Sequence, residues 1–178
     1  FIANIAGVRS HDVVRKGLQI LQNLEHRGAC GCDPDSGDGA GILIQISDGF
    51  MRREASALGF ELPEPGRYAV GSVFLSQDAT SAAWQQTAIE RVVADEGQTV
   101  LGWRDVPHDP AAIGPVARAE IPTIRQVFIA AGTGATDQDA FERKLYLIRR
   151  RGQNAVADNG VDDFFYVPSL SSRTIAYV

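Results

Sequence analysis

The sequence has few cysteines, no long apolar run and no excess of basic residues, and each shortage excludes a class of protein. Only two of its 178 residues are cysteine. Because Cys30 and Cys32 are one residue apart, they cannot build a disulfide framework, which favours a reducing cytoplasm. No apolar run approaches the roughly 20 residues that span a bilayer, so we expect no membrane segment. The net charge of -5 argues against a nucleic-acid-binding surface, since nothing supplies a basic patch for phosphates.

The sequence has one cluster of basic residues, Arg149, Arg150 and Arg151, directly before Gly152. Glycine is typical of the residue after a helix, and cations are favourable in the last turn because the helix dipole is negative there. We therefore expect a helix to end at this cluster. We prefer this interpretation to a phosphate site.

The two ends of the sequence do not resemble natural chain ends. No methionine precedes Phe1, no signal peptide is visible, and Val178 falls inside a predicted strand. We expect residues 1–178 to be part of a single domain that continues in both directions.

Hydrophobic periodicity predicts three long helices and a shorter one over residues 50–58. Ser10 is the expected N-cap of the first helix, and Asp78 or Ser81 that of the second. The faces expected to be buried are Val14, Leu18, Leu21 and Leu24 in the first helix, Trp84, Ala88, Val92 and Val93 in the second, and Phe141, Leu145 and Ile148 in the third.

Apolar runs bounded by turn residues predict seven strands. They cover residues 1–6, 42–46, 68–75, 98–105, 124–131, 164–167 and 173–177. We expect the last two to pair around a turn at residues 168–171, and strand 68–75 to pair with strand 124–131. These pairings favour an antiparallel α+β fold over a parallel α/β sheet.

A loop of glycines and acids, residues 29–39, separates the first helix from strand 42–46. A phosphate-binding loop normally runs from a strand into a helix, and Asp33, Asp35 and Asp38 would repel phosphate. A calcium loop needs a glycine at its sixth position and a glutamate at its twelfth, and both are missing. The third interpretation is a tight reversal that packs closely against other backbone, and it is compatible with the wall of an active site.

The cysteines of this loop have no partners for metal or redox chemistry in the sequence. A Cys-x-Cys pair has too few ligands for structural zinc, and the only nearby histidine is His26. A reactive thiol needs an electropositive setting, for which Arg27 is the sole candidate. We prefer to regard Cys30 and Cys32 as buried and inert.

The run around Arg27-Gly28 and the glycine–acid loop resembles a segment near the N-terminus of the glutaminase domain of glutamate synthases. These domains are class II glutamine amidotransferases of the N-terminal-nucleophile (Ntn) hydrolase type. Further blocks similar to the family follow in family order. They are residues 10–12, 101–107, 122–129, 141–146 and 169–175.

The resemblance implies a four-layer α/β/β/α Ntn-hydrolase sandwich of antiparallel sheets, of which this chain is a part. It implies hydrolysis of L-glutamine to glutamate and ammonia, with ammonia passing to 2-oxoglutarate at a synthase domain of the same polypeptide. It implies no cofactor in this chain, and FMN and an iron–sulfur cluster in the parent enzyme. A small pyridine-nucleotide-oxidising subunit is the implied bacterial partner.

The resemblance also assigns site residues. Arg27 and Gly28 match an Arg-Gly pair that helps to position the nucleophile. That nucleophile is an N-terminal cysteine whose own α-amino group serves as base, and we expect it a few residues upstream of Phe1. The glutamine-clamping arginine and the Asn-Gly oxyanion hole are expected beyond Val178. Arg173 is not that arginine, because it belongs to an earlier strand.

Two alternatives remain open. The chain is a non-catalytic α+β module used for binding or assembly, or it belongs to another class II amidotransferase, such as an amidophosphoribosyltransferase. The region around residues 102–105 does not resemble the latter. A cysteine encoded a few residues upstream of Phe1 would favour the enzyme over the module.

Overall fold

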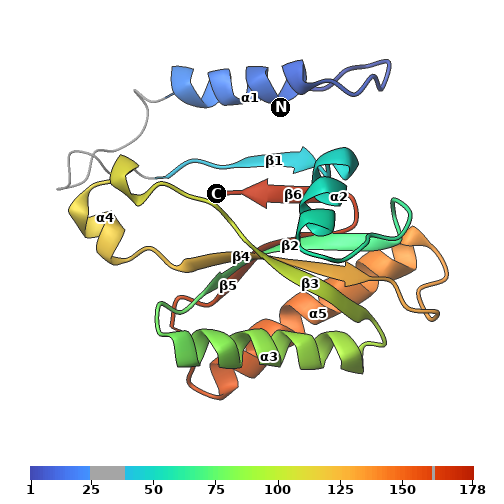
Figure 1. Cartoon of the computed structure of the whole chain (residues 1–178). Helices are drawn as coiled ribbons and strands as arrows, with labels where there is room; N and C mark the ends of the chain where they lie inside the picture. The colour runs from blue at the N-terminus through green and yellow to red at the C-terminus, as the bar shows by residue number, and fades with distance from the viewer. Residues whose placement is uncertain (25–38, 162) are drawn as a thin grey trace. The chain divides into compact units, whose positions relative to one another are not determined.

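The computed structural model describes residues 1–24, 39–161 and 163–178. The chain divides into two compact units. The first comprises Phe1–Ile44, Asp109–Glu120 and Tyr177–Val178, and the second comprises Gln45–His108 and Ile121–Ala176. A four-stranded sheet with two long helices forms most of the second unit (Figure 1).

The sheet of the second unit is antiparallel and has the strand order β3-β4-β2-β5. Its strands are β2 (Tyr68–Leu75), β3 (Thr99–Asp105), β4 (Thr123–Ala130) and β5 (Tyr166–Ser171). Strands β2 and β4 pair along their whole length, from Tyr68 opposite Ala130 to Leu75 opposite Thr123. The predicted pairing of these strands and the predicted antiparallel α+β class are therefore confirmed.

Helices α3 (Ala79–Asp95) and α5 (Gln138–Asp158) cover one face of this sheet (Figure 1). Each helix begins after an aspartate N-cap: the Asp78 side chain accepts from Ser81 N, and the Asp137 side chain accepts from Ala140 N. The core between helices and sheet includes Ala69, Val73, Val127 and Ile129 from the strands and Ile89, Val93, Phe141, Leu145 and Ile148 from the helices. The predicted face of α5 is confirmed.

The predicted face of α3 was partly wrong. Trp84 is 37% exposed, whereas its neighbour Gln85 is fully buried. The Gln85 amide is satisfied there, because its Oε1 accepts from Ser76 N at 2.8 Å and its Nε2 donates to Val161 O at 2.6 Å. A fully hydrogen-bonded amide loses little on burial, so Gln85, and not the adjacent Trp84, faces the core at this turn of α3.

The prediction that a helix ends at the arginine cluster was also wrong. Helix α5 continues past Gly152 to Asp158. Gly152 is buried within the helix, where an added Cβ would lie 3.6 Å from Ile89. Arg151 instead forms an ion pair with Glu96, which also accepts from Lys144 Nζ at 2.8 Å. These two cations lower the pKa of the Glu96 carboxyl.

The predicted hairpin of the last two strands was wrong in its pairing. Residues 168–171 belong to strand β5, which pairs with β2. Strand β6 (Thr174–Tyr177) pairs instead with β1 (Ile42–Gln45) in a separate two-stranded sheet. Pro168 is tolerated in β5 because that strand ends the order of the described sheet, and the β2–β5 register shifts beside it.

The first unit contains helix α1 (His11–Asn23), and its Ser10 N-cap accepts from Asp12 N as expected. The predicted strand over residues 1–6 is absent from the described chain. Phe1 and Ile5 are fully exposed there, and the Asn4 side chain accepts from Ala6 N at 2.9 Å to form a turn. Between β3 and β4 the chain forms a short 3-10 helix, Pro110–Ala112, and helix α4 (Pro115–Ala119).

No helix within the described ranges is both long enough and apolar enough to cross a membrane.

Candidate functional site

The candidate catalytic pair, Arg27 and Gly28, lies outside the described residues. The same holds for His26, for both cysteines and for the aspartates of the glycine–acid loop, which fall in residues 25–38. The roles assigned to these residues stay predictions.

Gly41, two residues after the glycine–acid loop, packs closely against another stretch of backbone. A Cβ on Gly41 would lie 2.9 Å from Val178 Cγ1 and 3.3 Å from the Tyr177 carbonyl oxygen. Gly39 has a φ of +86°, a left-handed conformation that side chains with a Cβ rarely adopt. Both glycines therefore fit the third interpretation of the loop, a tight reversal against neighbouring backbone.

We expect Gly39→Val to destabilise the chain by more than about 1 kcal/mol, because valine is strained at a positive φ. Equilibrium denaturation measures this change. Gly134→Val is the matched control, since an added Cβ at Gly134 also meets nothing within 4 Å but no positive φ is imposed there. Equal stability of the two variants would contradict the backbone argument. Unchanged stability with weakened phosphate binding would instead revive the phosphate-cradle interpretation.

A row of polar side chains crosses the face of the sheet opposite α3 and α5. Ser72 on β2 is opposite Gln126 on β4, which is opposite Arg104 on β3. Ser72 and Gln126 are buried, and the Arg104 side chain is only 12% exposed. We call these three residues the polar row.

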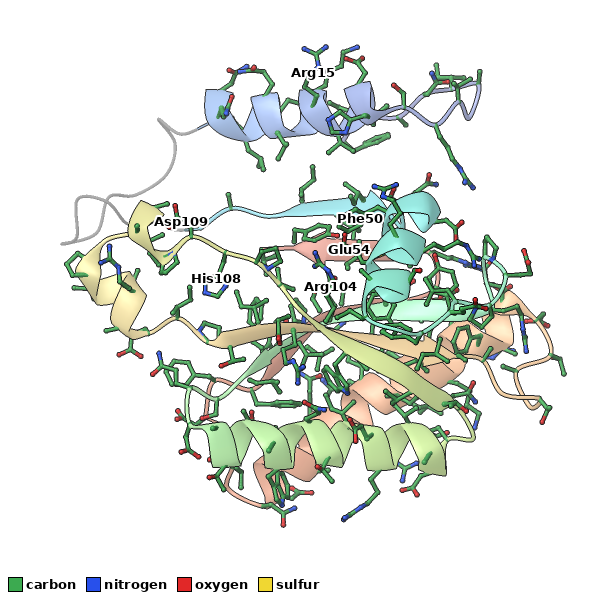
Figure 2. All side chains as sticks on the ribbon, viewed as in Figure 1. Arg15, Phe50, Glu54, Arg104, His108 and Asp109 are labelled. Carbon is green, nitrogen blue, oxygen red and sulfur yellow. The ribbon has the colours of Figure 1, made fainter. Side chains whose placement is uncertain are left out.

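Arg104 is the charged member of the polar row, and a carboxylate from helix α2 (Asp48–Ala57) compensates it. Its Nε donates to Glu54 Oε2 at 2.7 Å, and its Nη1 donates to Gln126 Oε1 at 3.2 Å. The guanidinium also lies 5.4 Å from the centre of the Phe50 ring. Figure 2 shows Arg104 directed from the sheet toward Phe50 and Glu54 of α2. These contacts replace the water that a buried cation loses.

A close approach beside the polar row requires glycine on β3. A Cβ on Gly102 would lie 2.5 Å from the Phe60 ring. Phe60 in turn packs edge-on against the buried Phe128 ring, with centroids 5.3 Å apart. The segment after α2 is therefore pressed onto the sheet at this point.

The start of α2 is fixed to the same face by a second polar group. The buried Tyr68 hydroxyl donates to Asp48 Oδ1 at 2.9 Å, and Arg52 Nε donates to the same carboxylate at 3.0 Å. Burial, together with the hydrogen bond to Asp48, raises the pKa of Tyr68 well above its ordinary value. The hydroxyl therefore stays protonated and acts as a donor.

These polar contacts fasten α2 to the sheet at both of its ends. Arg104 donates to Glu54 and the Tyr68 hydroxyl donates to Asp48, so neither side chain is available for proton transfer to a substrate. Among the described residues, no group of three or more histidine, cysteine or acidic side chains is arranged to hold a metal ion.

The structure brings together the blocks that carried the family resemblance. Arg104 of residues 101–107 contacts Gln126 of residues 122–129. Glu142 of residues 141–146 accepts from Ser171 and Ser172 of residues 169–175. Sequence reasoning assigned no role to these side chains, although their place in the blocks was a usable signal. Sequence reasoning also missed Glu54 and Ser72, which lie outside these blocks and carry no signal in the sequence.

The whole chain, residues 1–178, matches the family model described as glutamine amidotransferases class-II. The chain belongs to this family. It is 47% identical over 98% of its length to the glutamate synthase [NADPH] large chain of Bacillus subtilis. It is 38% identical over 99% of its length to glutamate synthase [NADH] of Schizosaccharomyces pombe, and 37% identical over 99% to a chloroplastic ferredoxin-dependent glutamate synthase of Oryza sativa.

This class II amidotransferase chain spans only a small part of those relatives. It covers 11% of the Bacillus protein, 8% of the Schizosaccharomyces protein and 11% of the Oryza protein. The comparisons therefore establish the family of this stretch of sequence. They do not extend to the activity of a longer polypeptide.

Proposed function

We propose that the chain is part of the glutaminase domain of a glutamate synthase, which hydrolyses L-glutamine and supplies ammonia for transfer to 2-oxoglutarate. The similarity to glutamate synthases along nearly the whole chain carries this proposal. A binding or assembly module that had lost the chemistry would account for the fold equally well. Such a module would have no need of the Arg27-Gly28 pair, whose place in the sequence matches the pair beside the family nucleophile.

The proposed reaction uses a cysteine upstream of Phe1 as nucleophile. Its α-amino group takes the proton of the thiol, and the resulting thiolate attacks the side-chain carboxamide carbon of glutamine. The α-amino group then passes that proton to the departing nitrogen, so that the C–N bond breaks, ammonia leaves and a thioester remains. Water then cleaves the resulting thioester to give glutamate and the free thiol. Arg27 and Gly28 are proposed to lie beside this cysteine, where the Arg27 cation favours the thiolate over the thiol.

We also propose that residues 1–178 belong to a single domain with the four-layer α/β/β/α architecture of Ntn hydrolases. Support comes from the second unit, in which helices α3 and α5 cover one face of an antiparallel sheet. The other face of that sheet is also buried: the Val70 and Phe128 side chains are inaccessible to solvent. A buried second face is what a further layer would produce.

The remaining partners of the reaction are proposed to lie in the rest of the polypeptide and beyond it. FMN and an iron–sulfur cluster would supply the redox chemistry of a separate synthase domain. A small pyridine-nucleotide-oxidising subunit would bring electrons in a bacterial enzyme. The cysteine usage of the chain supports a cytoplasmic location.

We expect the isolated 178-residue chain to release no ammonia from glutamine. Covalent catalysis needs an activated nucleophile, and neither Cys30 nor Cys32 has a free α-amino group to serve as base. We use the term complete enzyme for a polypeptide extended upstream to an N-terminal cysteine and downstream to the length of the relatives. The complete enzyme should release ammonia, and an ammonia assay on both proteins measures the difference.

Replacement of the upstream cysteine by serine in the complete enzyme is the control. It should abolish glutamine hydrolysis, whereas Cys30→Ser should leave it near wild type. Ammonia release by the isolated chain that disappears on Cys30→Ser would contradict the assignment of the nucleophile.

A further inference from the structure

An open groove of about 470 Å³ runs beside strand β3. A run of consecutive residues, Gln98–Trp103, forms one wall, and Glu90 and Ala94 of α3 form the other. Successive side chains of a strand point to opposite faces of its sheet. A hollow that every residue of such a run lines therefore lies along the edge of the strand, and not on one face of the sheet.

Strand β3 ends the order of the sheet, so β4 is its only neighbour among the strands that the structure describes. Val106 N donates to the Ile124 carbonyl at 3.0 Å, and the register continues from there to Arg104 opposite Gln126. Antiparallel pairs alternate between hydrogen-bonded and non-hydrogen-bonded ones. Arg104 is therefore bonded to β4, whereas the N–H and carbonyl groups of Trp103 point away from β4, toward the groove.

The two edges of this sheet differ in their protection. Strand β5 carries Pro168, which cannot donate to an added strand. Between Thr99 and Trp103, β3 has neither a proline nor a charged residue, which are common means of keeping an edge from pairing. The register shift in β3 lies before Gly102, so the half of the strand that carries Trp103 pairs regularly. Such an edge is a template for a further strand, whose axis would lie about 4.8 Å from β3.

The groove also selects the side chain that enters it. Glu90 is the only charged residue that lines it. Its Oε1 accepts from Trp103 Nε1 at 2.7 Å and from Gln86 Nε2 at 3.0 Å, and within the described ranges its Oε2 accepts from neither. That oxygen is open to a cation. Ala94 and Val100 add apolar surface beside it, which suits the stem of a lysine or arginine.

We propose that the groove holds an extended segment of the same polypeptide, from outside residues 1–178, which adds a strand to β3 and places a lysine or arginine against Glu90. This inference rests on the proposed function, in which the chain is part of a longer polypeptide. The chain covers only 11% of the Bacillus relative, so most of such a polypeptide is available to supply the segment. Main-chain bonds to Trp103 would give affinity, and the ion pair would set the register.

A second copy of the chain fits the groove less well than this segment. The cation that β3 of a second copy could bring is Arg104, and its side chain is only 12% exposed and already paired with Glu54. The charge of Glu90 would then stay uncompensated in the filled groove, which is costly for a group that loses water.

Hydrogen exchange in the complete enzyme, resolved to single amides by mass spectrometry, tests the proposal. The Arg104 amide is bonded to β4 and should exchange slowly whether or not the groove is filled. A filled groove should slow the Trp103 amide to within about tenfold of the Arg104 rate, whereas an open edge leaves it about a hundredfold faster or more. A Trp103 amide that exchanges at the rate of an open edge would overturn the proposal.

Glu90→Gln in the complete enzyme tests the ion pair, because it keeps an acceptor for Trp103 and Gln86 but removes the charge. It should speed exchange at Trp103 about tenfold and leave the Arg104 amide unchanged. Glu61→Gln is the control, since Glu61 is exposed and does not line the groove, and it should change neither amide. Equal exchange at Trp103 in Glu90→Gln and in the wild type would overturn the basic side chain in the groove.

Two further measurements separate this inference from its alternatives. Protection of Trp103 that grows with protein concentration would assign the groove to a second copy and overturn the proposal. A complete enzyme that hydrolyses glutamine while its Trp103 amide stays unprotected would overturn this inference alone. Protection of Trp103 in a complete enzyme that does not hydrolyse glutamine would overturn the proposed function and leave the added strand in place.

Discussion

Arg27→Ala in the complete enzyme is expected to lower glutamine-dependent turnover by about tenfold or more. A cation beside the nucleophilic cysteine favours the reactive thiolate, and each ~1.4 kcal/mol of lost transition-state stabilisation is a factor of ten in rate. Turnover with free ammonia should survive, because that chemistry is proposed for another domain. Both activities are measured on one preparation, so that their ratio cancels differences in folded fraction.

Arg150→Ala is the matched control, since Arg150 is an exposed cation on α5, and it should change neither activity. The competing interpretation of Arg27 is a solvated cation at a helix end, worth a few tenths of a kcal/mol. If both activities of Arg27→Ala stay near wild type, that interpretation is correct and the functional role is wrong.

Glu54→Ala is expected to destabilise the chain by about 2 kcal/mol. It leaves the Arg104 guanidinium, 12% exposed, without the carboxylate that compensates its burial. Removing one member of a buried ion pair typically costs about 3–5 kcal/mol. The value here is lower because the Glu54 side chain is 33% exposed and water partly screens the pair. Equilibrium denaturation of the isolated chain measures the loss.

The double variant Glu54→Leu/Arg104→Met is expected to recover most of that stability, because two apolar side chains leave no uncompensated charge. Arg15→Ala is the surface control. Arg15 pairs with Asp12 on α1, but its side chain is 73% exposed, so its loss should cost less than about 0.5 kcal/mol. A double variant as unstable as Glu54→Ala would show that the polar contacts themselves, and not relief of a buried charge, hold α2 on the sheet.

Local signals in the sequence predicted most of the helices and strands. Asp78 and Ser10 act as N-caps because their side chains bond to backbone groups two or three residues away, which is a matter of short-range geometry. The apolar runs of β2 and β4 predicted both strands and their pairing. Prediction failed for residues 1–6, where an apolar run has no partner strand in the described chain and Asn4 forms a turn.

The candidate site was predictable only in outline. The family blocks pointed to Arg104 and Glu142 without assigning either a partner. Glu54 binds Arg104 from 50 residues away, and Ser72 binds the Ala176 carbonyl from 104 residues away. No periodicity or motif encodes such separations, because each contact depends on where two elements lie after the sheet has formed.

Caps, turns and hydrophobic periods act over a few residues, so they located most helices and strands and indicated the antiparallel α+β class, whereas the family was indicated by whole blocks of sequence. The sheet that β6 joins, the buried face of α3 and the carboxylate that meets Arg104 depend on contacts between distant parts of the chain. Those outcomes follow from burial. A polar group enters the interior only where distant parts of the chain supply its hydrogen-bond partners, as they do for Gln85, Arg104 and Ser72.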